Sequence, residues 1–240
     1  MTTLAILQDR SKLAWHRDLV STPKTHAWVL SLYRAGEHHP EEVRDYFPAR
    51  HAPCPELAAK IVRHRDDEAN HVRIYDRAIA SLGEVCETFD GLDVFNNAIR
   101  AKTGLSFAIA DIMSPSEKTV RVAHFLAHAH FLEQRVHQSL EYHLEACTRY
   151  GLAEVVTLVD RVRSDESHHL RYTGEAVIDL VGRRDGHRIL DLHRRAEQRA
   201  NRAFSARQVR SFLARFPEVG RQRHRLLYAA GAFLMDTFSV

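Results

Sequence analysis

The sequence is poor in glycine and proline, with 10 and 7 of them among 240 residues. They gather between long segments that repeat with the period of a helix, so we expect an all-α protein. No apolar run approaches the ~20 residues that a helix needs to cross a bilayer. The N-terminal residues show no basic region followed by a small-residue cleavage site, so we expect no signal peptide and a cytoplasmic location.

Cysteine is also scarce. The three cysteines, Cys54, Cys86 and Cys147, lie far apart and form no CxxC pair. This spacing argues against a disulfide framework, a zinc knuckle or an iron–sulfur module. We therefore expect core or surface thiols.

Histidine, in contrast, is abundant at 17 residues, and positive charge is concentrated near the C-terminus. From Arg183 to Arg225 there are 13 arginines against four acidic residues, a net charge of +9 in a chain of +3. Such a stretch favours an anionic partner, for example a carrier protein, a coenzyme A ester or tRNA. A solvated helical face is an equally good interpretation.

The helical pattern indicates four long helices in two hairpins, followed by a helical extension. The hairpins have short loops, and one connection of about thirty residues joins them, as in ferritin-like bundles. We expect a single domain, 1–240, with a core bundle at about 23–182 and an extension at about 187–238. The four long helices are expected at 23–47 with a kink at Pro40, 56–82, 116–148 and 152–181. A short helix is expected near 92–101, and two or three more beyond Gly186, of which the last is 226–238.

One nine-residue pattern occurs twice. Residues 65–73 and 163–171 both fit R-x-D-E-x-x-H-[VL]-R, with five identities in nine positions. In each copy Glu and His are three residues apart, so they share a helix face and can reach one ion. A single ExxH has little weight in a chain rich in both residues. Two matched copies on predicted helices indicate a metal site.

Each copy has a carboxylate partner on the preceding helix. Glu37 and Glu68 are equidistant from the loop at 48–55, and Glu133 and Glu166 are equidistant from the Tyr150-Gly151 turn. Residues equidistant from the turn of an antiparallel hairpin lie at the same height. The sequence therefore predicts one catalytic metal centre whose ligands are Glu37, Glu68, His71, Glu133, Glu166 and His169.

Four carboxylates in a helical core call for cations. Burying unpaired negative charges would cost several kcal/mol each, and two divalent ions would cancel them. Carboxylate and imidazole ligands together suit iron or manganese better than magnesium or structural zinc. We expect two Fe ions, with Mn/Fe or Mn as alternatives.

Two aspartates are expected to support the ligand histidines. Asp67 and Asp165 each precede a ligand glutamate, and we expect Asp67 to accept a hydrogen bond from His169, and Asp165 from His71. A surface position is the alternative for both.

Other side chains near the expected centre have more than one interpretation. Tyr75, four residues after His71, is a core aromatic or a redox-active tyrosine. His130 and His137 share the helix face of Glu133. Either of them could be an extra ligand or a proton relay, and the alternative is that both are packed polar residues. His168 offers a rival pairing with Asp165 in place of Glu166 with His169.

On these residues the sequence resembles the ferritin-like di-iron carboxylate superfamily. The patterns E-x29-D-E-x-x-H from Glu37 and E-x31-D-E-x-x-H from Glu133 are similar to those of its oxygen-activating members. These include the soluble methane monooxygenase hydroxylase, the ribonucleotide reductase small subunit, acyl-carrier-protein desaturases and aryl-amine oxygenases. The resemblance covers about residues 25–182 and implies a ferritin-like four-helix bundle. In size the chain looks like aldehyde-deformylating oxygenase and the tRNA-modifying di-iron hydroxylases.

The sequence also departs from these families. His137 stands where the methane monooxygenase type has a threonine, and the absence of CxxC removes the rubredoxin domain of a typical rubrerythrin. Tyr75 stands where the reductase small subunit has its radical tyrosine.

The resemblance implies an O2-dependent non-haem di-iron oxidase or oxygenase acting on a small-molecule or carrier-bound organic substrate. No flavin or NAD motif is visible, so an external electron donor is expected. A ferroxidase, a peroxide-reducing ferritin-like protein and a non-enzymatic helical binding protein stay as alternatives. The sequence leaves the oligomeric state, a homodimer included, open.

Overall fold

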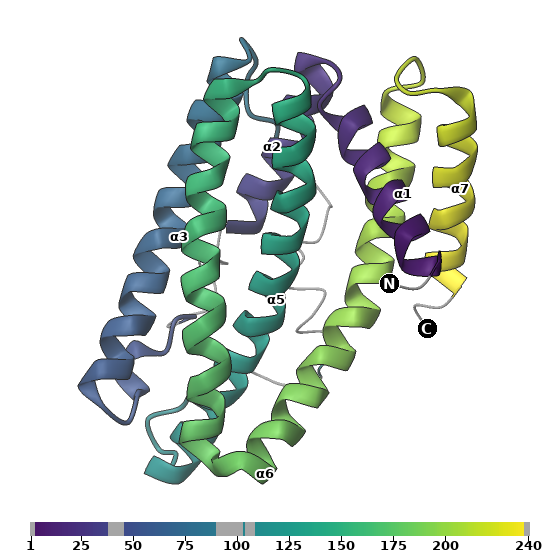
Figure 1. The fold of residues 1–240 in the computed structure, drawn as a ribbon. Helices are drawn as coiled ribbons and strands as arrows, with labels where there is room; N and C mark the ends of the chain where they lie inside the picture. Colours follow the sequence, from purple (N-terminus) through teal and green to yellow (C-terminus); the bar gives the residue numbers. More distant parts are fainter. Residues whose placement is uncertain (1–2, 38–45, 90–102, 104–108, 238–240) are drawn as a thin grey trace.

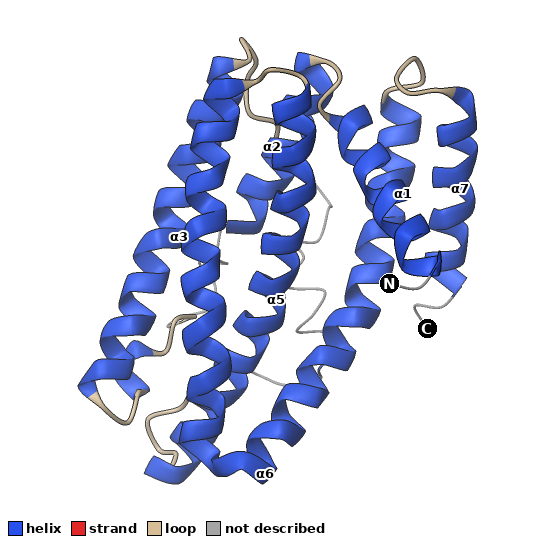
Figure 2. Ribbon diagram, viewed as in Figure 1, coloured by secondary structure: helices blue, strands red, loops and turns tan. Residues whose placement is uncertain are grey.

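The computed structural model describes residues 3–37, 46–89, 103 and 109–237. This part of the chain contains helices and loops but no strand, which confirms the all-α prediction (Figures 1 and 2). Its elements are α1 (Thr3–Leu19), α2 (Pro23–Glu37), the 3-10 turn η1 (Ala49–His51), α3 (Pro55–Ser81), α5 (Pro115–Arg149), α6 (Ala153–Arg215) and α7 (Gln222–Thr237). None of these helices is long and apolar enough to span a membrane.

The predicted helices 56–82 and 116–148 match α3 and α5 to within one residue at each end. α5 begins with a capping box, in which the Ser114 side chain accepts a hydrogen bond from the Glu117 backbone and Glu117 reaches back to the Ser114 backbone. The helix ends before Gly151, whose φ of 70° is the left-handed conformation that glycine adopts without strain.

The prediction of a first core helix over 23–47 is wrong at its end. α2 is described only to Glu37, and residues 46 and 47 form a bend. The expected kink at Pro40 and the short helix near 92–101 lie outside the described residues.

α6 changes direction at Gly182, where φ is 78° and ψ is 162°. The first half corresponds to the predicted helix 152–181, and the second half runs back along the molecule toward α7 (Figure 1). The expectation that the extension begins beyond Gly186 is therefore corrected, because helix resumes directly after Gly182. Gly186 lies in the helix just after the turn, where an added Cβ would meet the Ile178 Cδ1 atom at 2.7 Å.

Helix α1 was not predicted, because its charged and apolar residues show no clear helical face. Its stability comes from packing against the C-terminal part of the chain. The Trp15 ring lies 4.8 Å from that of Phe212 on α6 and 5.0 Å from that of Tyr228 on α7, centroid to centroid. α1, the second half of α6 and α7 thus lie beside one another (Figure 1).

Two apolar layers enclose a polar layer between α2, α3, α5 and the first half of α6. One layer contains Leu30, Tyr75, Ile79, Leu140, Val155, Val159 and Val162, and the other contains Ile61, Val122, Leu126 and Val177. The buried glutamates and ligand histidines of the repeated pattern lie between the two layers along each helix. The helical period therefore places these polar groups where water is largely excluded.

Candidate metal centre

The structure brings all six predicted ligands together in the polar layer, and all six are buried. They form two groups of ligand atoms, each group within 4.8 Å from end to end. The first consists of Glu37, Glu68, His71 and Glu166, and the second consists of His64, Glu68, Glu133 and His169. Because Glu68 belongs to both, the two groups form one centre.

The first group surrounds the Nδ1 atom of His71. This nitrogen lies 3.3 Å from Glu166 Oε1, 3.7 Å from Glu68 Oε1 and 3.8 Å from Glu37 Oε2. Ligand atoms at such separations can all lie at about 2.1 Å from one shared cation.

In the second group the Nδ1 atom of His169 lies 3.5 Å from Glu68 Oε1, and Glu166 Oε2 of the first group lies 3.0 Å from the same nitrogen. The two oxygens of Glu166 therefore face different histidines. Glu68 and Glu166 occupy bridging positions, whereas Glu37 lies only with His71.

His64 is a member of the second group that the sequence did not reveal. Its Nε2 atom lies 3.1 Å from Glu133 Oε1 and 3.4 Å from Glu68 Oε1, and its ring stacks on His169 with centroids 3.8 Å apart. The feature of the sequence that could have indicated this ligand is its position four residues before Glu68, on the same helix face. The second copy has Val162 at the equivalent place, so the repeat did not single out His64.

The three histidines share one arrangement, in which one ring nitrogen faces the centre and the other meets a polar side chain. Asp165 Oδ2 lies 3.4 Å from His71 Nε2, and Asp67 Oδ2 lies 3.3 Å from His169 Nε2. The Tyr172 hydroxyl lies 2.7 Å from His64 Nδ1. Both aspartates lie where the sequence placed them, whereas Tyr172 was missed. These contacts hold each imidazole with its free nitrogen toward the centre.

Tyr75 lies beside the centre and is fully buried. Within the described part of the chain its hydroxyl has no hydrogen-bond partner. Burial raises the pKa of Tyr75 well above its usual value, and the charges of Glu37 and Glu166 raise it further. The phenol therefore stays protonated and contributes an available donor near the carboxylates.

The remaining histidines of the sequence prediction lie elsewhere. His168 is exposed, so its proposed pairing with Asp165 is wrong. His137 lies 3.9 Å from Glu141 and belongs to neither ligand group. His130 contacts the Leu170 carbonyl and the Thr173 hydroxyl at 3.2 and 3.3 Å. His137 and His130 thus lie outside the two groups.

The electrostatics of the centre favour cations. Burial and the surrounding carboxylates raise the pKa of Glu68 and that of Glu166 well above the usual glutamate value. Burial also opposes ionisation of Glu133, but the contact with His64 overcomes it and lowers the pKa of Glu133 to about 2. Without a cation, the centre therefore favours protons on the two bridging glutamates.

Two buried atoms without hydrogen-bond partners in the described part of the chain indicate that these residues fit a metal ion. The Nδ1 of His71 and the Oε1 of Glu166 are buried and 3.3 Å apart, yet neither makes a hydrogen bond among the described residues. Buried polar atoms without partners are costly, and a shared ion would satisfy both. The donor set of carboxylate oxygens and imidazole nitrogens suits divalent iron, manganese or zinc.

A cavity of about 750 Å³ reaches the centre from the side of the C-terminal extension. Glu37, Glu68 and Glu133 form part of its wall. Most of the remaining wall is apolar and comes from α1, α5, the second half of α6 and α7, for example Trp15, Leu132, Phe204, Leu227 and Met235. A pocket of this size holds a medium-sized organic molecule.

No protein-family model matches this chain, and no curated protein or solved structure matches it significantly. The residues themselves are therefore the basis for assigning a function.

Proposed function

We propose that the protein is a ferritin-like di-iron oxidoreductase that uses O2 to oxidise an organic substrate. The observation that carries this proposal is the pair of ligand groups that share Glu68, with a cavity that reaches the same glutamate. The antiparallel pairs α2/α3 and α5/first half of α6, with a long connection between α3 and α5, support a ferritin-like bundle.

Two ions would be held by seven side chains. Glu37 and His71 would bind one, His64, Glu133 and His169 the other, and Glu68 and Glu166 would bridge them. When bound, a diferrous pair would supply the electrons that reduce O2. Manganese at one or both positions is compatible with the same donor set.

The protein's own residues position the ligands and exclude water. Asp67, Asp165 and Tyr172 accept or share the proton on the outer nitrogen of each ligand histidine, which keeps the inner lone pair free. The apolar layers above and below the centre keep bulk water away. Tyr75 would hold its proton at the phenol oxygen beside Glu37 and Glu166.

The cavity favours an organic substrate over iron itself as the molecule oxidised. Its apolar wall would hold a hydrocarbon or aromatic group against Glu37 and Glu133. A ferroxidase needs a polar path for hydrated ions and has no use for an apolar chamber of this size. Electrons would come from a separate donor protein.

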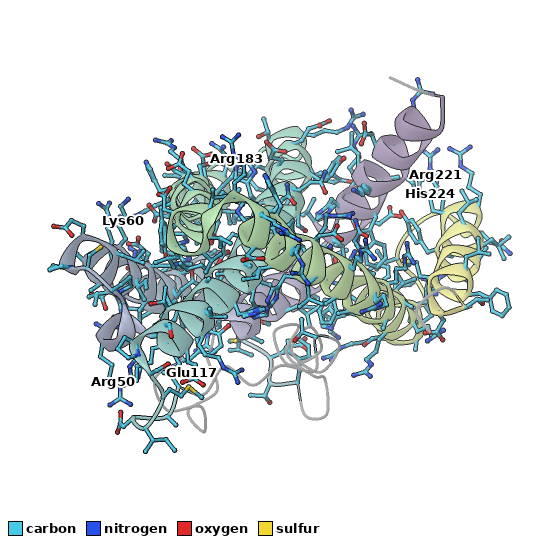
Figure 3. The ribbon with its side chains drawn as sticks, turned by 90° about the horizontal axis from the view of Figure 1, so that it is seen from below. Arg50, Lys60, Glu117, Arg183, Arg221 and His224 are labelled. Atoms are coloured by element: carbon cyan, nitrogen blue, oxygen red, sulfur yellow. The ribbon has the colours of Figure 1, made fainter. Side chains whose placement is uncertain are left out.

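The arginine-rich stretch is a weaker basis for a partner. It extends for roughly 50 Å along the second half of α6, so that Arg183 and Arg221 lie well apart (Figure 3). Several of its arginines have internal roles. Arg215 pairs with Glu87 at 2.7 Å, and Arg225 donates hydrogen bonds to the Phe216 and Leu213 carbonyls. Docking of an anionic carrier protein, coenzyme A ester or tRNA stays a proposal, which binding at rising salt concentration tests.

The proposed function is tested by single-turnover reaction of the iron-loaded protein with O2. Apolar aldehydes, carboxylic acids and arylamines would be added one at a time, and oxidised products measured by mass spectrometry. We expect two irons per chain and a product from at least one class. Rapid O2 consumption with free Fe²⁺ alone, and no organic product, would favour a ferroxidase. The absence of bound iron or manganese would contradict both functions.

A further inference from the structure

A second group of metal-ligating side chains lies between α2 and α5, apart from the carboxylate centre. His26, His143 and Cys147 are all buried. His26 Nε2 lies 3.0 Å from His143 Nε2 and 3.6 Å from Cys147 Sγ. The three ligand atoms lie within 4.8 Å of one another.

We propose that His26, His143 and Cys147 form a separate structural site for zinc or another thiophilic divalent ion. Zinc lies about 2.0–2.1 Å from imidazole nitrogen and about 2.3 Å from thiolate sulfur. In a tetrahedron with these bond lengths, the nitrogen–nitrogen edge is about 3.3 Å and the nitrogen–sulfur edge about 3.6 Å. The two measured separations, 3.0 and 3.6 Å, lie close to these edges.

The positions of the residues along the helices suit a shared ion. His143 and Cys147 are four residues apart on α5, which places them on one face of the helix. His26 comes from α2, so an ion here would tie the first core helix to the third. Because the three side chains are buried, the site is closed to solvent, as structural rather than catalytic zinc sites are.

His16 on α1 lies beside this group without belonging to it. His16 is buried, and its ring lies 5.9 Å from that of His143, centroid to centroid. Its Nδ1 atom has no hydrogen-bond partner among the described residues, and the same is true of the Nδ1 atoms of His26 and His143. The Nε2 atoms of His26 and His143 face each other at 3.0 Å, and an ion between them would bind both nitrogens.

The donor set differs from that of the carboxylate centre. No carboxylate belongs to the group of His26, His143 and Cys147, and its sulfur ligand is soft. Thiolate ligands select zinc and cuprous ions over harder cations such as magnesium or manganese. On binding, the Cys147 thiol would release its proton to solvent and form the metal–sulfur bond as a thiolate.

Cobalt(II) titration of the metal-free, full-length protein tests the site directly. A cobalt–thiolate bond gives a near-ultraviolet charge-transfer band that oxygen and nitrogen ligands do not produce. We expect this band with one equivalent of cobalt beyond those bound at the carboxylate centre. Added zinc should remove it and raise the melting temperature.

Three variants show which cysteine binds cobalt and whether the band depends on the carboxylate centre of the proposed function. Cys147→Ser should abolish the band, whereas Cys86→Ser, at a half-buried thiol outside the group, should keep it. Glu68→Gln, which disturbs only the carboxylate centre, should also keep it.

The outcomes are distinct. A wild-type protein without the band, or a band that survives in Cys147→Ser, would overturn the zinc site and leave a hydrogen-bonded imidazole pair beside an inert thiol. If Cys147→Ser fails to fold, as judged by circular dichroism, His26→Gln should weaken cobalt binding, so that the band appears only at a higher cobalt concentration. An unchanged cobalt affinity in His26→Gln would overturn the site. A band with no metal at the carboxylates would contradict the proposed function alone.

Discussion

Asp67 Oδ2 lies 3.3 Å from Nε2 of His169, a residue on the opposite helix of the centre. The reverse pair, Asp165 with His71, has almost the same separation, 3.4 Å. α3 and the first half of α6 thus exchange equivalent contacts, so that the repeated pattern of the sequence becomes a local two-fold arrangement. Each aspartate supports a histidine of the other copy.

Replacing either aspartate by asparagine is expected to weaken metal binding by about 10- to 100-fold, because the imidazole loses its anionic acceptor. Asp67→Asn and Asp165→Asn would be compared by calorimetric titration with Fe²⁺ under anaerobic conditions. Asp66→Asn is the matched control, since this neighbour is exposed and pairs with Arg65. Equal Fe²⁺ affinities for all three variants would contradict the supporting role of Asp67 and Asp165.

His64 is expected to be needed for the second ion only. His64→Ala removes a nitrogen from the group that contains Glu133 and His169, so the bound metal should fall from two ions per chain toward one. Elemental analysis after loading and desalting measures this content. His168→Ala, at an exposed position on the other repeat, should keep two ions. A variant at His64 with full occupancy would show that this imidazole is not a ligand.

Filling the cavity is expected to separate substrate binding from metal binding. Ser205 lines the cavity from the second half of α6, and Ser205→Trp would occupy part of its volume. We expect unchanged iron content and at least a tenfold lower yield of oxidised product, with O2 still consumed. Arg199→Trp, on the same helix but exposed and outside the cavity, serves as the control. Full product yield in the Ser205 variant would place the substrate elsewhere.

Acid is expected to destabilise the protein through His193. Burial, assisted by the neighbouring His128 and His124, lowers the pKa of His193 to about 3. Between pH 6.5 and the folded-state pKa, His193 binds a proton in the unfolded chain but not in the folded one. The free energy of unfolding therefore falls as pH falls, by roughly 1.4 kcal/mol per pH unit.

Urea unfolding of metal-free protein at pH 7.5, 6.0 and 5.0 measures the effect of His193. His193→Gln should lose less stability than the wild type over this range. Parallel pH profiles for the two proteins would show that His193 is protonated in the folded state.

The reversal of α6 is expected to depend on a small residue at position 186. An added Cβ at Gly186 would lie 2.7 Å from Ile178 Cδ1 and 3.1 Å from the Ile178 backbone, so Gly186→Ala should destabilise by about 1–3 kcal/mol. Gly231→Ala, where an added Cβ meets nothing within 4 Å, should instead stabilise α7 by up to about 1 kcal/mol. Thermal unfolding of both variants checks the contrast, and a neutral Gly186→Ala would show that the turn can relax.

The sequence alone determined α3, α5 and the first half of α6, and it brought the six predicted ligands to one level. Helical period is a local property, so Glu68 and His71 had to share a face, and equal distance from a turn brought Glu37 to the level of Glu68. The same reasoning placed Asp67 and Asp165 beside the opposite histidines. The placement of the ligands holds because it depends only on spacing within a helix or across a short hairpin. The two aspartate contacts also require α3 and α6 to be neighbours, as they are in the expected bundle.

The tertiary structure decided what depends on packing between distant segments. The roles of His64 and Tyr172 appear only when α3 and α6 lie together, because neither residue belongs to the repeated pattern. α1 carries no clear periodic signal, and its helix is stabilised by Phe212 and Tyr228 from the other end of the chain. The cavity, and the meeting of His26 with Cys147, likewise require contacts that no local rule specifies, because side-chain burial is set by the whole fold.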